Sequence, residues 1–119
     1  MADELYVVDS TGERKRADSK EEVWISNSLH KLGLWFIFQY WVDGGKIIPG
    51  GMVVDWVINT GGYVALEFFG EFWHNKMKDD DDQLKLERLR DRFWRVVVLT
   101  EKEVWDQKSA DEAIRHEFV

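Results

Sequence analysis

The chain of 119 residues contains no cysteine, which excludes both a disulfide framework and a thiolate zinc site. Its fold is therefore expected to be independent of the redox compartment. No apolar run approaches the ~20 residues that are needed to cross a bilayer. The first ten residues, 1–10, are acidic and mixed rather than basic and then apolar. We therefore expect a cytoplasmic protein that has no membrane partner.

Positive charge is also in short supply, because 16 Lys and Arg face 23 Asp and Glu, for a net charge of −7. This balance argues against nucleic acid as a partner, since clustered cations drive phosphate binding. The basic residues do gather in two stretches: Arg14, Lys15 and Arg16, and then Lys76, Lys78, Lys85, Arg88, Arg90, Arg92 and Arg95. They form either a local basic face or solvated helix positions interleaved with acids, and the sequence leaves both open.

What the chain does have is apolar material: 45% hydrophobic residues, with seven Trp and seven Phe. A disordered chain does not carry so much, and the length suits one domain of roughly 100–150 residues. We therefore predict a single domain over 1–119. It consists of an N-terminal strand and basic turn over 1–18, a core over 19–99 and C-terminal helices over 100–119.

Capping boxes and hydrophobic periodicity predict the elements. Ser19-x-x-Glu22 has the form of a capping box, and apolar residues follow it at helical spacing. The strand at 94–99 is so continuously apolar that we expect burial on both faces. The predicted strands are 5–8, 34–42, 52–58, 63–69 and 94–99, and the predicted helices are 20–32 and 79–92, with short ones starting at the boxes Thr100-x-x-Glu103 and Ser109-x-x-Glu112. The order β-α-β-β-β-α-β-α-α indicates an α/β fold.

Two carboxylates stand in strands that are otherwise apolar. Asp55 lies in the strand 52–58 and Glu67 in 63–69, and a buried carboxylate needs a partner. A three-residue loop, 60–62, would place the two acids directly opposite each other on one face of the hairpin. A two-residue loop, 61–62, would send them to opposite faces. The sequence does not decide between these registers.

If the two acids face each other, their repulsion is best relieved by a divalent cation bound through oxygen ligands, for which Mg²⁺ or Mn²⁺ is suitable. Glu22 shares a helical face with the apolar residues that pack on the sheet, so a third acid could converge on the same point. The alternative is that Glu22 acts only in the capping box.

The series Ser19-x-x-Glu22, Gln39, Val54-Asp55-Trp56 and Ala65 to His74 resembles the PD-(D/E)XK nuclease superfamily. It looks most like the small very-short-patch-repair-like and phage or homing endonuclease branch. The most specific part is Phe69-Gly70-Glu71-Phe72-Trp73-His74. The resemblance covers roughly 19–99 and implies a restriction-endonuclease-like core, with a mixed central sheet flanked by helices.

The resemblance implies that Asp55 and Glu67 bind a catalytic Mg²⁺ or Mn²⁺, together with the backbone carbonyl of Phe68. Glu22 would orient water or a second ion, and Gln39 would lie at the mouth of the site. His74 would be a proton donor or acceptor near the scissile phosphate, because imidazole titrates near neutral pH. Taken alone, His74 is equally well a surface or aromatic-stacked histidine.

One departure from the family pattern concerns lysine. The family usually has lysine two residues after the second acid, where this chain has Phe69. Lys76, Lys78 and Lys85 are near enough in sequence to replace it, and some branches use histidine.

We therefore expect a Mg-dependent endodeoxyribonuclease whose partner is DNA, acting as a homodimer or with a partner protein that carries specificity. The alternatives are a catalytically inactive DNA-binding relative of the same fold and an acidic protein-interaction subunit.

Overall fold

The computed structural model describes residues 4–45, 47, 50–70 and 80–119, without the side chains of 80–82. These residues form an α/β fold with a mixed four-stranded sheet, as predicted. The elements are β1 (Tyr6–Val8), β2 (Arg14–Arg16), α1 (Lys20–Lys31), β3 (Trp35–Val42), β4 (Met52–Asn59), β5 (Tyr63–Phe69), α3 (Asp80–Arg92), β6 (Arg95–Thr100) and α4 (Gln107–Phe118). Within the described residues no helix is long and apolar enough to cross a membrane.

The main sheet has the strand order β3-β4-β5-β6. The first three strands run antiparallel, whereas β6 is parallel to β5 and follows a crossover that contains α3. In the hairpin between β4 and β5, Asn59 pairs with Tyr63, so the loop has three residues. Gly61 takes a φ of +100° in this loop, a conformation that suits glycine. The register left open by the sequence is therefore the one that brings Asp55 and Glu67 opposite each other.

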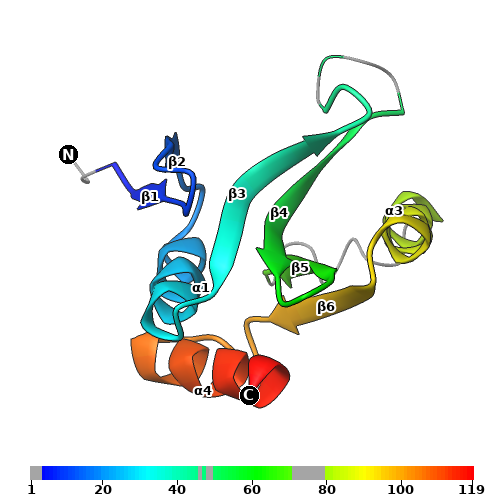
Figure 1. Cartoon of the computed structure of the whole chain (residues 1–119). Coiled ribbons are helices and arrows are strands. Elements are labelled where there is room, and N and C mark those ends of the chain that lie inside the picture. Colours follow the sequence, from blue (N-terminus) through cyan, green and yellow to red (C-terminus); the bar gives the residue numbers. More distant parts are fainter. Residues whose placement is uncertain (1–3, 46, 48–49, 71–79) are drawn as a thin grey trace.

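A small hairpin of β1 and β2 lies beside β3 (Figure 1). Residues 14–16 were predicted as part of a polar turn, and the structure corrects this to a strand. The hairpin covers the outer edge of β3, because Ser10 N–H donates to the Phe36 carbonyl (2.9 Å) and Phe38 N–H donates to Asp9 Oδ2 (3.0 Å). Pairing an exposed strand edge in this way removes a site for aggregation.

Helices α1 and α4 lie on one side of the main sheet and α3 on the other (Figure 1). The larger core lies under α1 and α4, where Leu29 and Ile114 pack with the fully buried Trp56. A smaller core lies under α3, where Leu89 packs over Val57 and Ala65. This side of the sheet is less completely covered, so Val96 and Val98 of β6 are only half-buried. The prediction of burial on both faces was wrong for this strand.

Both predicted C-terminal capping boxes need correction. At Thr100 the Glu103 carboxylate accepts the Thr100 N–H (2.7 Å), but the chain makes only a turn there. Helix α4 then begins at Gln107 with Asp106 as its N-cap, so that Ser109 is the third helical residue rather than the cap. The Ser109 hydroxyl accepts the Asp106 N–H (3.0 Å), and this reciprocal pair fixes the helix start earlier than predicted.

Candidate functional site

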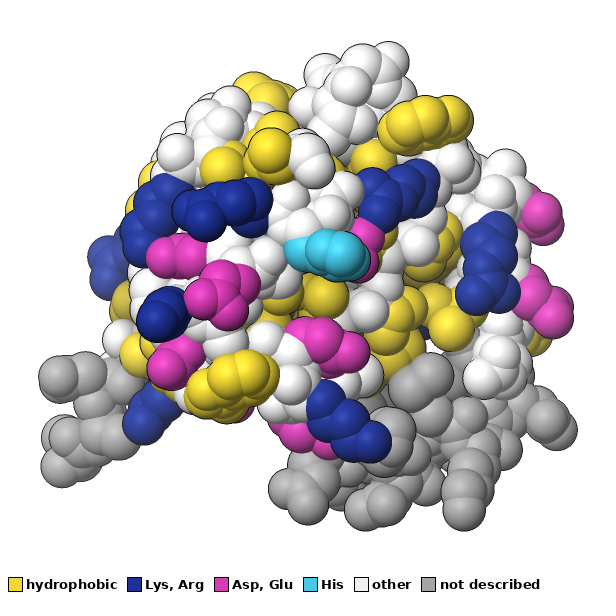
Figure 2. Space-filling model, turned by 90° about the horizontal axis from the view of Figure 1, so that it is seen from below, with side chains coloured by type: hydrophobic (Ala, Val, Ile, Leu, Met, Phe, Trp, Pro, Cys, Tyr) yellow, Lys and Arg dark blue, Asp and Glu magenta, His cyan; other side chains and the backbone are white. Residues whose placement is uncertain are grey.

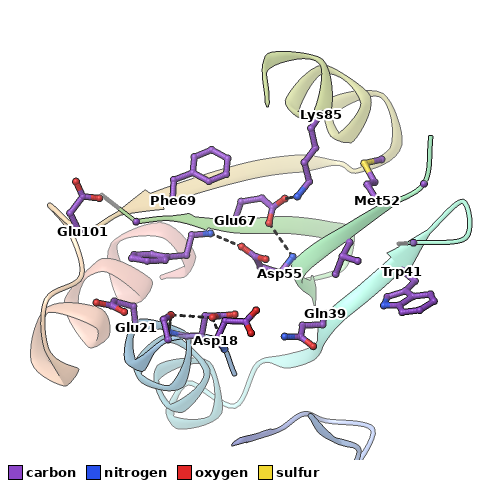
Figure 3. Close-up of a pocket in the computed structure, with 17 residues that line it drawn as sticks. Asp18, Glu21, Gln39, Trp41, Met52, Asp55, Glu67, Phe69, Lys85 and Glu101 are labelled. Atoms are coloured by element: carbon purple, nitrogen blue, oxygen red, sulfur yellow. Dashed lines mark hydrogen bonds and ion pairs between the residues drawn. The ribbon is translucent and has the colours of Figure 1, made fainter. Parts of the chain in front are cut away.

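The hydrogen-bond ladder between β4 and β5 ends at the pair Trp56 and Leu66, and the next two opposed residues are Asp55 and Glu67. From this point on, the carboxylate side chains accept the hydrogen bonds of the strand backbone. Asp55 N–H donates to Glu67 Oε2 (3.0 Å), and Phe68 N–H donates to Asp55 Oδ2 (2.9 Å). The two strands separate at this point with both carboxylates between them (Figure 3). The structure thus brings together the two acids that the sequence singled out.

Gln39 occupies the same row of the sheet on β3, between the regular pairs Phe38 with Trp56 and Tyr40 with Val54. Its φ of +54° is unusual for a residue other than glycine, and such strain is often found at functional sites. The side-chain amide donates to the Arg16 carbonyl (3.0 Å), which ties β3 to β2. Gln39 also lines the cavity beside Asp55.

Lys85 reaches this row from α3, and its Nζ lies 2.5 Å from Glu67 Oε1. Glu67 is fully buried, with 0% of its surface exposed, and Lys85 is the charged partner of its Oε1. The ion pair with Lys85 therefore compensates its charge. The sequence indicated Lys85 only as one of three lysines. The spacing of Lys85 gives a further signal. Leu89 lies four residues later, on the same face of the helix, and is buried, so Lys85 and Leu89 both point inward.

Electrostatics in the row disfavour the charged form of Asp55. Burial, and then the negative charge of Glu67, raise the pKa of Asp55 well above its usual range, while the Phe68 N–H and Lys85 lower it less. Lys85 contacts Glu67 rather than Asp55, so the charge of Asp55 is left without a direct ion-pair partner among the described residues.

The carboxylates open onto a cavity of about 800 Å³ (Figure 3). Its described lining runs from the start of α1 to the end of β6 and is strongly acidic. The acids are Asp18, Glu21, Glu22, Asp55, Glu67 and Glu101, and Lys85 is the one basic side chain in that lining. A cation would be attracted to this cavity more strongly than an anion would.

Glu22 lines the cavity but is occupied by the cap of α1. Its Oε1 accepts from Asp18 N–H (3.0 Å) and from the Ser19 hydroxyl (3.0 Å). Burial is the main cause that raises the pKa of Glu22. In the part of the chain that the structure describes, no three His, Asp or Glu residues are placed to hold one ion. The expected convergence of Glu22 with Asp55 and Glu67 on a shared ion is therefore not found, because the helix cap holds the Glu22 carboxylate.

Of the other residues named from the sequence, the structure describes Phe68 and Phe69. Phe68 lines the cavity and contributes its N–H to Asp55. Phe69, in the usual lysine position, is buried and lies on the same side of β5 as Lys85 (Figure 3). His74 lies outside the described residues, as do Lys76 and Lys78.

Of the 13 lysines and arginines that the structure describes, seven form ion pairs with acids. Lys15 lies 3.7 Å from Asp9, and Arg95 pairs with Glu117. The end of the molecule drawn in Figure 2 shows basic and acidic side chains intermingled. This pattern agrees with the interpretation as solvated, interleaved charges.

Comparisons with protein-family models, curated proteins and solved structures gave no significant match. Function is therefore inferred from the geometry of the site.

Proposed function

We propose that this protein is a metal-dependent nuclease that hydrolyses phosphodiester bonds in DNA, with a restriction-endonuclease-like core. The observation that carries the proposal is the contact between Asp55, Glu67 and Lys85 at the point where β4 and β5 separate. Two acids from neighbouring strands are part of the series on which the resemblance to PD-(D/E)XK nucleases rests, and a nearby lysine is the group that this family usually adds to them. Here the lysine comes from a helix, whereas the usual strand position holds Phe69.

The donor set suits a hard divalent cation. Asp55 and Glu67 present carboxylate oxygens, and Phe68, which follows Glu67 directly, lines the same cavity. Mg²⁺ prefers oxygen ligands and usually keeps several waters, so two carboxylates and one carbonyl would be sufficient. The raised pKa of Asp55 supports the fit, because a bound cation would favour the charged form that burial and Glu67 now disfavour.

When bound, Mg²⁺ or Mn²⁺ would supply positive charge that activates water and stabilises the reacting phosphate. Lys85 keeps its ammonium group beside Glu67, from where it can donate a hydrogen bond to a non-bridging phosphate oxygen. Hydrolysis forms a bond from the water oxygen to phosphorus and breaks the bond from phosphorus to O3′. The products are a 5′-phosphate and a 3′-hydroxyl that carries one of the water protons.

A specific observation also favours the second candidate, an inactive DNA-binding relative. Lys85 and Glu67 already satisfy each other, as a purely structural ion pair would. Such a protein would bind DNA without cleaving it.

The experiment is to incubate the purified protein with supercoiled, nicked and branched DNA in Mg²⁺, in Mn²⁺ and in EDTA. We expect cleavage of at least one substrate with a metal and none in EDTA. Asp55→Asn and Glu67→Gln should each abolish cleavage while the circular dichroism spectrum stays native, because both residues would hold the ion.

The matched control is Asp91→Asn, which removes an exposed carboxylate of α3 and should leave cleavage unchanged. Binding without cleavage of any substrate in either metal would favour the inactive relative. No binding at all, with no effect of metal on stability, would refute both.

A further inference from the structure

A second cavity of about 520 Å³ lies on the α3 side of the sheet. Trp35 pairs through Asn59 with Tyr63 across the sheet, so these two aromatic residues share one face. Trp35 is 41% exposed and Tyr63 is 55% exposed. We call this cavity the aromatic groove, and its lining includes Trp35, Ile37, Tyr40, Trp41, Tyr63 and Arg92.

Helix α3 reaches the groove at Arg92 and leaves several of the aromatic residues in its lining exposed. Leu89 packs with Val57 and Ala65, whereas Trp35 and Tyr40 of β3 are both 41% exposed. Large aromatic residues exposed together are unusual on a protein surface that has no binding role.

One carboxylate of the groove, Asp43, contacts two guanidinium groups, of which Arg92 lines the groove and Arg88 does not. Arg92 lies 2.6 Å from Asp43 and Arg88 lies 3.2 Å from the same oxygen. Both arginine side chains remain partly exposed. In a chain of net charge −7, this is a local excess of positive charge that suits phosphate groups.

The groove and the cavity at the carboxylates adjoin at one side chain. Trp41 lines both cavities, and it follows two residues after Gln39 on β3. Gly45 packs against the Trp41 ring so closely that an added Cβ would overlap it. A polymer lying in the groove would thus be led past Trp41 toward Asp55 and Glu67.

We propose that the aromatic groove binds unpaired nucleotides of the DNA substrate. The protein should therefore prefer single-stranded or flapped DNA to a plain duplex. Bases would stack on the exposed rings, and Arg88 and Arg92 would face the phosphates. A duplex keeps its bases stacked inside, so it offers no ring faces to the groove. The inference rests on the proposed nuclease function for the identity of the substrate.

The test is fluorescence anisotropy in EDTA, with a labelled single strand of 12 thymidines and a labelled duplex of equal length. We expect the wild type to bind the single strand more tightly. Trp35→Ala and Tyr63→Ala should each weaken that binding about tenfold, the order expected for losing one stacked base. Trp105→Ala is the matched control, since Trp105 is 62% exposed and lies outside the groove, and it should bind as the wild type does.

Thermal unfolding of each variant shows whether it is folded, and Arg92→Gln provides a second, non-aromatic probe of the groove. Single-strand binding that both aromatic substitutions leave unchanged would overturn the groove proposal, even if the protein cleaves duplex DNA. Weakened binding without cleavage in any metal would support the groove and contradict the nuclease. Self-association that Trp35→Ala abolishes, without single-strand binding, would show that the groove is an interface between copies of the chain and overturn the proposal.

Discussion

Asp55 combines burial with a neighbouring carboxylate, and both raise the free energy of its charged form. Lys85 contacts Glu67, so Asp55 has only the Phe68 N–H as a direct hydrogen-bond donor among the described residues. The Asp55 carboxylate therefore lowers the free energy of unfolding at neutral pH unless a cation binds to it. This cost is the expected signature of a site built for binding rather than for folding.

Replacing Asp55 with asparagine should therefore stabilise the protein in EDTA at pH 7, by a few degrees in Tm. The folded pKa of Asp55 lies above its unfolded value, so its contribution to stability is full below the unfolded pKa, near 4, and is lost as pH rises through the folded value. The gap between Asp55→Asn and the wild type should accordingly widen from pH 4 to pH 8, measured by thermal unfolding.

The same experiment with Mg²⁺ tests the cause. The ion should raise the Tm of the wild type and leave Asp55→Asn unchanged, because only a state that binds the ion gains stability from it. If Asp55→Asn is destabilised at every pH, the Asp55 carboxylate serves to hold the strands together.

The sequence identified Asp55 and Glu67 because each is the one acid in an apolar strand. It did not single out Lys85, since the contact with Glu67 depends on how α3 crosses the sheet, 18 positions further along the chain. His74 stays a prediction. Glu22 was expected to face the ion, but its capping interactions are local and hold its carboxylate at the helix start.

At the scale of elements, α1 offers a test of that capping role. Glu22→Ala should lower the free energy of unfolding by about 1 kcal/mol, because it removes the acceptor for Asp18 N–H and the Ser19 hydroxyl. The single-turnover cleavage rate should stay within a few-fold of the wild type. Chemical denaturation and a cleavage assay check the two parts, and a large loss of rate with normal stability would make Glu22 catalytic.

Helices α1 and α4 are joined by a polar cluster around Asp111, which accepts from Ser28 (2.6 Å), Lys31 (2.8 Å) and Gln107 (3.0 Å). Burial tends to raise the pKa of Asp111, but these hydrogen bonds outweigh it and lower the pKa to about 2. The cluster therefore links two helices that cover the larger core.

Because the folded pKa of Asp111 is depressed, its contribution is present above the unfolded pKa and is lost as pH falls from about 4 to about 2. Asp111→Ala should cost about 1 kcal/mol at pH 7, allowing for partial solvent screening, and much less at pH 2. Urea denaturation at the two pH values measures the difference. An equal loss at both would assign the effect to packing.

Local patterns placed most element boundaries within one or two residues. The predicted helix 20–32 became α1, and the predicted strand 63–69 became β5. The errors fall where tertiary contacts decide the conformation. Residues 14–16 form a strand because β1 lies beside them, whereas Thr100 ends β6 and residues 101–103 make only a turn before α4.

At the scale of the whole molecule, the site exists because the sheet opens along one row. Gln39, Asp55 and Glu67 come from three adjacent strands, and Lys85 reaches them from the α3 side. Sequence patterns predict the strands, but the parallel addition of β6 and the placement of α3 depend on packing of the whole chain. The site is therefore a property of the assembled fold, although its two acids can be recognised one by one.

The claim that Asp55, Glu67 and Lys85 form one catalytic site is tested most directly by the Lys85→Met variant. The measurement is its single-turnover rate of Mg²⁺-dependent DNA cleavage. We predict a loss of about 100-fold or more, because an ammonium group that stabilises the reacting phosphate would be absent. Lys31→Met, which breaks the exposed ion pair with Asp111, should cleave at the wild-type rate. Cleavage by folded Lys85→Met at the wild-type rate would contradict the account.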